Sequence, residues 1–157
     1  MPGEFALIYK YFARPTPSAI LGPGDDCALL QPTPGKQLAI TTDMLVAGTH
    51  FLPDTDPHNL GWKALAVNLS DLAAMGATPR WVLLAGSLPA VDEPWIANFA
   101  DGFFACAAEY NVDVVGGDMT RGPLNLCITA LGECAPGQAL RRDGAHTGDL
   151  VWVSGRP

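Results

Sequence analysis

Residues 60–75 constrain the fold most, because they are apolar on almost every side of the helix that they predict. The run Asp56-Pro57-His58-Asn59 is a helix start signal before this stretch, and Gly76 is a stop signal after it. A helix that is apolar nearly all round is largely buried in a folded protein. The remainder of the chain must therefore supply a layer that covers this helix. Its strongly polar members are only Lys63, Asn68, Ser70 and Asp71.

Predicted helices and strands alternate along the rest of the sequence. Further helices are expected at residues 4–12 and 95–110, and Asp92 and Pro94 suit the start of the second. This interleaving favours an α/β (α+β) fold in which helices pack on a sheet. The 157 residues suffice for one domain with a full core, or for two small ones. Strands are expected at residues 27–30, 37–42, 45–51, 81–88, 112–115, 124–133 and 150–154, with a proline- and glycine-rich loop at 15–24.

Charge and hydropathy narrow the class of partner. Nine basic residues against sixteen acidic ones give a net charge of −7, which argues against nucleic acid or an anionic membrane as the main partner. No apolar run approaches the roughly 18 residues of a membrane-spanning helix, and the first residues lack the pattern of a signal peptide. We therefore expect a soluble, cytoplasmic protein. The scattered cysteines predict buried free thiols and neither a zinc nor a redox motif: Cys27, Cys106, Cys127 and Cys134.

The acidic residues are mostly aspartates, twelve against four glutamates, and several stand beside glycine, serine, threonine or asparagine. Short carboxylates flanked by hydroxyls and small residues suit hard cations with oxygen ligands. Turn and helix-cap chemistry explains any one such cluster equally well. Four clusters in one small chain favour a metal site. They are Gly24-Asp25-Asp26, Thr41-Thr42-Asp43, Asn68-Leu69-Ser70-Asp71 and Gly116-Gly117-Asp118.

Two of these clusters carry specific expectations. Asp71 is expected to be a buried carboxylate, which is costly unless it is paired or bound to metal, and Asn68 would share its helix face. The alternative is that this face is the exposed stripe of the helix. The glycines at 116–117 would let the backbone approach a phosphate at a strand end, where Asp118 adds a metal ligand and Arg121 a phosphate donor. A tight hairpin turn explains the same glycines.

The cluster at residues 41–43 follows a predicted strand and offers two hydroxyls and a carboxylate. His50 lies seven residues beyond Asp43, and a lone histidine is more often a structural hydrogen-bonding residue than a functional one. Several carboxylates that meet without cations would repel one another. Magnesium ions and a nucleoside triphosphate would neutralise them, so the residue types together indicate metal-dependent phosphoryl chemistry.

Taken together, four motifs resemble the thiamine-monophosphate kinases, in the right order and spacing from Glu4 to the end of the chain. They are GDDCA from Gly24, TTDMLVAGTHF from Thr41, NLSDLAAMGA from Asn68 and GGDMTRG from Gly116. The wider superfamily includes aminoimidazole-ribonucleotide synthetase, selenophosphate synthetase and the hydrogenase-maturation dehydratase. The four motifs in combination are specific, whereas any one of them is not.

The resemblance implies ATP-dependent phosphorylation of thiamine phosphate to thiamine diphosphate, by direct in-line transfer with several Mg²⁺ ions. It implies catalytic roles for Asp43 and Asp71 and a thiamine-phosphate contact at His50. It also implies a four-stranded sheet with helices on one face, whose partner copy completes an eight-stranded barrel in a homodimer. The implied nucleotide contacts are Gly117, Asp118 and Arg142, and the implied metal ligands are Asp26, Thr41, Thr42, Asp43, Asp71 and Asp118.

The resemblance also implies a second domain, which we expect to lie beyond these 157 residues. We expect residues 1–150 to form the N-terminal ATP- and magnesium-binding and dimerisation domain, and residues 151–157 to begin the connection to a C-terminal domain. Two alternatives stay open. One is a sibling ATP-dependent synthetase, which the Thr49-His50-Phe51 context disfavours. The other is a non-catalytic module that binds magnesium nucleotide and dimerises.

Overall fold

A four-stranded mixed sheet forms the centre of the computed structural model, which describes residues 4–153 and 155. The strand order is β3-β6-β4-β5, from β3 (Gln37–Val46), β4 (Thr78–Leu88), β5 (Asp113–Arg121) and β6 (Asn125–Cys134). β6 pairs antiparallel with both β3 and β4, whereas β4 and β5 are parallel. The parallel pair needs a crossover, and helix α3 (Glu93–Glu109) supplies it.

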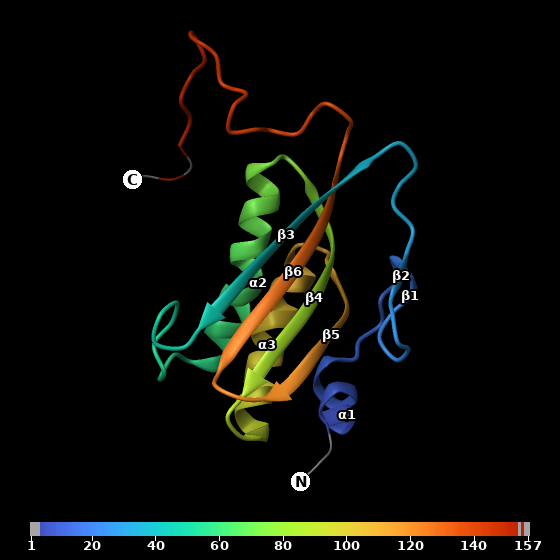
Figure 1. Ribbon diagram of the computed structural model, residues 1–157, viewed down its shortest axis with the longest axis vertical. Helices are drawn as coiled ribbons and strands as arrows, with labels where there is room; N and C mark the ends of the chain where they lie inside the picture. The colour runs from blue at the N-terminus through green and yellow to red at the C-terminus, as the bar shows by residue number, and fades with distance from the viewer. Residues whose placement is uncertain (1–3, 154, 156–157) are drawn as a thin grey trace.

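Helices α2 (Pro57–Ala74) and α3 cover one face of this sheet, and Figure 1 shows both behind it. Each helix begins as the sequence predicts. The Asp56 carboxylate accepts a hydrogen bond from the Asn59 N–H at 2.9 Å, and Asp92 caps α3 in the same way. The core therefore lies between one sheet face and two helices, which confirms the predicted packing.

The two helices approach each other closely through glycine. A Cβ atom at Gly61 of α2 would overlap the Phe99 carbonyl oxygen of α3, and a Cβ atom at Gly102 would overlap the His58 carbonyl oxygen. With only hydrogen at these two positions, α2 and α3 touch backbone to backbone. This close packing lets the apolar helix predicted at residues 60–75 be covered by α3 on one side and by the sheet on the other.

A smaller N-terminal part packs beside β5, as Figure 1 shows. It contains α1 (Glu4–Leu7), the π-helical turn η1 (Ile8–Phe12) and a two-stranded sheet of β1 (Ala19–Leu21) and β2 (Leu29–Leu30). Phe12 is buried and packs against Phe99 of α3, with ring centroids 6.5 Å apart and the rings tilted by 58°. The predicted helix at 4–12 is thus confirmed as two short turns, and its aromatic end belongs to the main core.

Several expected elements are wrong. Residues 45–51 are not a separate strand, because β3 continues to Val46 and a turn follows it. Residues 150–153 form no strand and are exposed, and Ser154 lies outside the described residues. The cysteines differ among themselves. Cys106 and Cys134 are buried as expected, whereas Cys27 is exposed.

Burial changes the chemistry of one thiol. Loss of hydration, with a smaller contribution from the negative charge of Glu109, raises the pKa of Cys106 to about 11. This thiol therefore stays protonated in the core. None of the described helices has the length and hydropathy to cross a bilayer.

Candidate functional site

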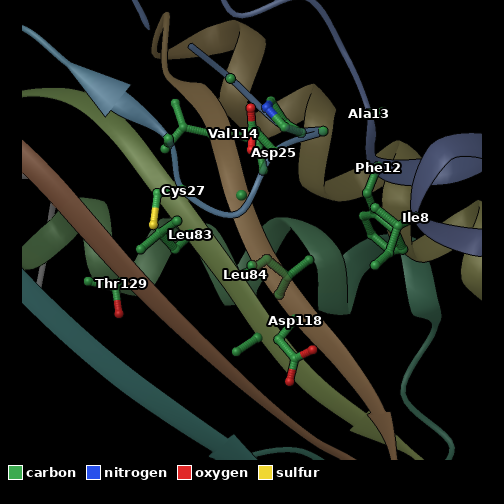
Figure 2. Close-up of a pocket in the computed structure, with 18 of the residues that line it drawn as sticks. Ile8, Phe12, Ala13, Asp25, Cys27, Leu83, Leu84, Val114, Asp118 and Thr129 are labelled. Carbon is green, nitrogen blue, oxygen red and sulfur yellow. The ribbon is translucent and has the colours of Figure 1, made fainter. Parts of the chain in front are cut away.

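A cavity of about 800 Å³ lies between the sheet and the N-terminal part of the chain (Figure 2). Its floor comes from β4, β5 and β6, including Leu83, Val114 and Thr129, and one wall comes from the loop between β1 and β2. Ile8 and Phe12 of the N-terminal turn close another side, as Figure 2 shows. The floor is mostly apolar, so the polar groups at its rim decide what binds there.

Three of the sequence-predicted site residues meet in this cavity: Asp26, Gly117 and Asp118. Asp118 stands on β5, and Figure 2 shows its carboxylate at one end of the cavity with Asp25 near the other and Leu83 and Leu84 between them. Two carboxylates and a glycine backbone around an apolar floor can hold a flat apolar group together with metal-bound phosphates.

At Gly117 the backbone of β5 lies very close to the backbone of β4 at Leu84. The φ of +149° at Gly117 and the carbonyl oxygen of Leu84, which a Cβ atom would overlap, both exclude a side chain at this position. The β4–β5 register also shifts here, because Val82 pairs with Val114 while Leu83 pairs with Gly116. The expected strand end or hairpin turn at these glycines is wrong, since they lie inside β5.

Two pairs of part-buried hydrogen bonds hold the segment that carries Asp26. At its start, the Ser18 N–H and hydroxyl both donate to Asp113 Oδ2, at 2.8 and 2.6 Å. At its end, the Thr33 N–H and hydroxyl both donate to the Glu133 carboxylate, each at 2.7 Å. Residues 18–33, which we name the strap, are therefore held to β5 and β6 at their two ends and border the cavity between them.

Glu133 is only 6 % exposed, and its charge is compensated locally. Burial opposes ionisation, but the two hydrogen bonds from Thr33 and the positive charges of Arg80 and Lys36 outweigh it. Together they hold the pKa of this carboxyl below its ordinary value. Arg80 Nη1 lies 3.0 Å from Glu133 Oε2 and its guanidinium lies over the Trp81 ring. The strap therefore ends on an ionised carboxylate.

A second group of predicted residues lies between β3 and α2. The Thr41 hydroxyl donates to Asp71 Oδ2 at 2.9 Å, and Asp43 is on the same face of β3 as Thr41. Thr42 points to the opposite face, where its hydroxyl donates to the Ile128 carbonyl oxygen at 3.0 Å. Successive strand residues alternate in this way, so the two threonine side chains do not reach the same place.

The expectation for the polar face of α2 is half wrong. Asp71 is exposed, as the alternative of an exposed stripe required, and its neighbour Asn68 is the buried residue. The Asn68 amide donates to the Ala64 carbonyl oxygen at 3.1 Å, while its Oδ1 has no hydrogen-bond donor in the described structure.

The remaining predicted residues lie apart from the cavity. His50 follows β3 and accepts a hydrogen bond from the Val46 N–H at its Nδ1, at 3.0 Å. Arg142 is exposed in the irregular segment after β6, next to the ion pair of Arg141 and Asp143. Among residues 4–153 and 155, no three histidine, cysteine, aspartate or glutamate side chains are close enough to hold one ion. The predicted metal ligands thus form two groups, Asp26 with Asp118 and Thr41 with Asp43 and Asp71, while Thr42 lies outside both.

Sequence reasoning missed the two carboxylates that hold the strap. Asp113 and Glu133 lie 95 and 100 residues from their partners Ser18 and Thr33, and neither belongs to a recognisable motif. Asp113 starts β5 and Glu133 falls near the end of β6, where the expected pattern is apolar. The one available signal was the presence of a charged residue in an otherwise apolar strand at 124–134.

Residues 24–134 match the family model described as "AIR synthase related protein, N-terminal domain". A thiamine-monophosphate kinase from Salmonella typhimurium is 54 % identical over 158 residues, which cover 99 % of this chain and 49 % of that protein. The chain thus spans about half the length of the curated relatives that it matches.

Solved structures of related proteins share this fold, among them the following two. The crystal structure of thiamine-monophosphate kinase from Stenotrophomonas maltophilia K279a has a TM-score of 0.80 at 56 % identity, with 85 % of this chain and 42 % of that chain covered. The structure of AaThiL complexed with AMPPCP and TMP has a TM-score of 0.68 at 32 % identity, with 92 % and 45 % covered.

Proposed function

Because the chain belongs to the AIR synthase related proteins, through their N-terminal domain, we propose that it is the nucleotide- and magnesium-binding half of a thiamine-monophosphate kinase. The observation that carries this proposal is the cavity that brings Asp26, Gly117 and Asp118 together. These residues come from two of the four motifs that the chain shares with that kinase group, and the high identity to its members supports the same assignment.

The proposed reaction transfers the γ-phosphoryl group of ATP to thiamine phosphate. A phosphate oxygen of thiamine phosphate attacks the γ-phosphorus in line, the bond to the β-γ bridging oxygen breaks, and ADP and thiamine diphosphate result. In this scheme Gly117, Asp118 and Arg142 contact the nucleotide and His50 contacts thiamine phosphate. The complex of a related chain with AMPPCP and TMP supports this pair of substrates.

The residues present fit Mg²⁺ in their chemistry. All the proposed donors are carboxylate or hydroxyl oxygens, and Asp26 and Asp118 border the same cavity. When bound, Mg²⁺ neutralises phosphate charge and orients the transferring group. We assign Asp43 and Asp71 as the catalytic carboxylates of this scheme. The proposed ligands are Asp26, Thr41, Thr42, Asp43, Asp71 and Asp118, which bind metal together with phosphate oxygens of the nucleotide.

We further propose that the open sheet face forms a homodimer and that two copies complete an eight-stranded barrel. Leu38, Ile40 and Met44 of β3 are 42–63 % exposed on this face, and such an exposed apolar patch is unfavourable in a monomer.

In this proposal residues 1–150 are the nucleotide-binding and dimerisation domain, and residues 151–157 begin a connection to a second domain. The use of ATP, with four free cysteines among the described residues, supports a cytoplasmic location.

The test is phosphoryl transfer by a polypeptide that carries this chain together with the other half of the family's length. With ATP, Mg²⁺ and thiamine phosphate, we expect thiamine diphosphate and ADP in equal amounts. Asp71→Asn should abolish the reaction, because an amide is a poor ligand for a hard cation. Exposed Asp101→Asn on α3 is the matched control and should keep it. Production of ADP without thiamine diphosphate would contradict the proposed acceptor.

A further inference from the structure

The turn that carries His50 fixes which ring nitrogen bears the proton. A backbone N–H can only donate, so the bond from Val46 N–H requires that Nδ1 of His50 be the acceptor. The neutral ring therefore carries its proton on Nε2. The turn itself is held by His50 N–H donating to the Val46 carbonyl oxygen at 2.9 Å and by buried Phe51. His50 thus offers an N–H donor from a fixed backbone.

Lys63 ties this turn to α2. Its ammonium donates to the His50 carbonyl oxygen at 2.6 Å, which is a charge-assisted hydrogen bond across 13 residues of sequence. Lys63 is exposed, so the core does not require its side chain. Its one recorded polar contact is with the residue that we assign to thiamine phosphate.

A second link between the same two segments joins Thr41 of β3 to Asp71 of α2. Lys63 and Asp71 are eight residues apart on one side of α2, which separates them by about 12 Å along the helix axis. Thr41 and His50 lie nine residues apart along the β3 side. Two hydrogen bonds thus join α2 to the β3 side. One involves Asp71, the assigned metal ligand, and the other involves His50, the assigned substrate residue.

We propose that Lys63 is a positioning residue, which holds the Nε2–H of His50 at a set distance from Asp71 so that it binds a phosphate oxygen of the acceptor substrate. An N–H donor needs an acceptor atom, and phosphate oxygens are the strongest acceptors on thiamine phosphate. The inference rests on the proposed function for the identity of that substrate, but the tautomer and the link to α2 do not depend on it.

The experiment compares Lys63→Met, which removes the ammonium, with Lys63→Arg, which keeps a charged donor. Lys36→Met is the control, because it removes another exposed lysine in the turn before β3. Hydrogen exchange of the Val46 N–H, followed by NMR, reports whether the imidazole keeps its place. Loss of one charge-assisted bond should speed this exchange about tenfold in Lys63→Met, whereas Lys63→Arg and Lys36→Met should stay within about threefold.

The second measurement is steady-state kinetics in the polypeptide that carries both halves. Lys63→Met should raise the KM for thiamine phosphate about tenfold, while kcat and the KM for ATP stay within about twofold and Lys63→Arg restores the wild-type KM. A general structural defect would instead move both KM values.

Unchanged Val46 exchange in Lys63→Met overturns the positioning role, whatever the kinetics give. Faster exchange with an unchanged KM for thiamine phosphate overturns the substrate part of the proposal. A wild-type polypeptide that makes no thiamine diphosphate refutes the proposed function and the ligand assigned to His50, and the exchange measurement then still decides whether Lys63 holds the turn.

Discussion

Glu133 is the residue on which the position of the strap most depends. It accepts two hydrogen bonds from Thr33 and an ion pair from Arg80 while it is almost fully buried. A buried carboxylate is stable only when its charge is compensated, and here three polar contacts from two segments do so. Ionised Glu133 thus helps to hold the β2–β3 turn on the sheet.

Glu133→Gln should lower the free energy of unfolding by about 1–3 kcal/mol, because an amide nitrogen cannot accept the bond from Thr33 and the Arg80 charge loses its partner. Chemical denaturation at pH 7 measures this change. Glu109→Gln at the exposed end of α3 is the control and should change stability by less than about 0.5 kcal/mol. Equal effects of the two substitutions would contradict the role given to Glu133.

The lowered pKa of Glu133 also predicts a pH dependence. A carboxyl whose folded-state pKa lies below its unfolded value stabilises the fold above the unfolded pKa, near 4.3, and loses that contribution as the pH falls through the folded pKa. Wild type should therefore lose more stability than Glu133→Gln below about pH 4.5. Parallel stability profiles of the two proteins down to pH 3 would contradict this.

At the residue scale, the sequence predicted which aspartates belong to candidate site motifs, but it did not predict which of them are buried. The clusters around Asp26 and Asp118 do border one cavity, as the excess of aspartate beside small residues indicated. Asp71 was expected inside because its helix is apolar all round. Asn68 is buried, and three residues turn a side chain by about 60° around the helix axis, which here places Asp71 at the exposed edge of the face that Asn68 shares with it.

At the scale of elements, β5 shows how a strand can be mistaken for a turn. Two adjacent glycines and an aspartate are typical of a hairpin turn, and residues 112–115 alone predicted a strand. In the structure β5 continues through Gly117 to Arg121, because pairing with β4 supplies the hydrogen bonds that local propensity does not. The helices were easier to predict, since both are capped by aspartates that lie next to them in sequence.

Gly117→Ala should lower the free energy of unfolding by roughly 2–5 kcal/mol, the combined cost of a strained positive φ and of overlap with the Leu84 carbonyl group. Gly35→Ala separates the two causes. Gly35 also has a positive φ, of +77°, but open space around it, so its cost should be only about 1–2 kcal/mol. If urea denaturation gives the two variants the same stability, β5 does not approach β4 as described.

At the scale of the whole molecule, one sheet face packs on helices and the other is open. The sequence predicted the packed face, because a nearly all-apolar helix has to be buried against another layer of the fold. For the open face, the resemblance to the thiamine-monophosphate kinases implied a partner copy. The position of the strap depends on contacts about 100 residues apart, which no local pattern encodes.

Ile40→Asp tests the proposed dimer, since Ile40 is 63 % exposed on the open face of the edge strand β3. Sedimentation at micromolar concentration should give a dimer for wild type and a monomer for this variant, because each dimer would bury two unpaired carboxylates. Val91→Asp, on the loop before α3, should remain dimeric. A monomeric wild-type chain that carries Leu38, Ile40 and Met44 on its surface would contradict the proposal.

The central claim is that this chain binds a nucleotide through magnesium held by its aspartates. Calorimetric titration with a non-hydrolysable ATP analogue tests it most directly, in the presence and absence of Mg²⁺, for wild type and Asp71→Asn. We expect binding by wild type only with Mg²⁺, and at least about tenfold weaker binding by Asp71→Asn. Because Asp71 is exposed, this substitution should change apo stability by less than about 0.5 kcal/mol. Equal affinity of Asp71→Asn and wild type, or binding that does not depend on Mg²⁺, would contradict the claim.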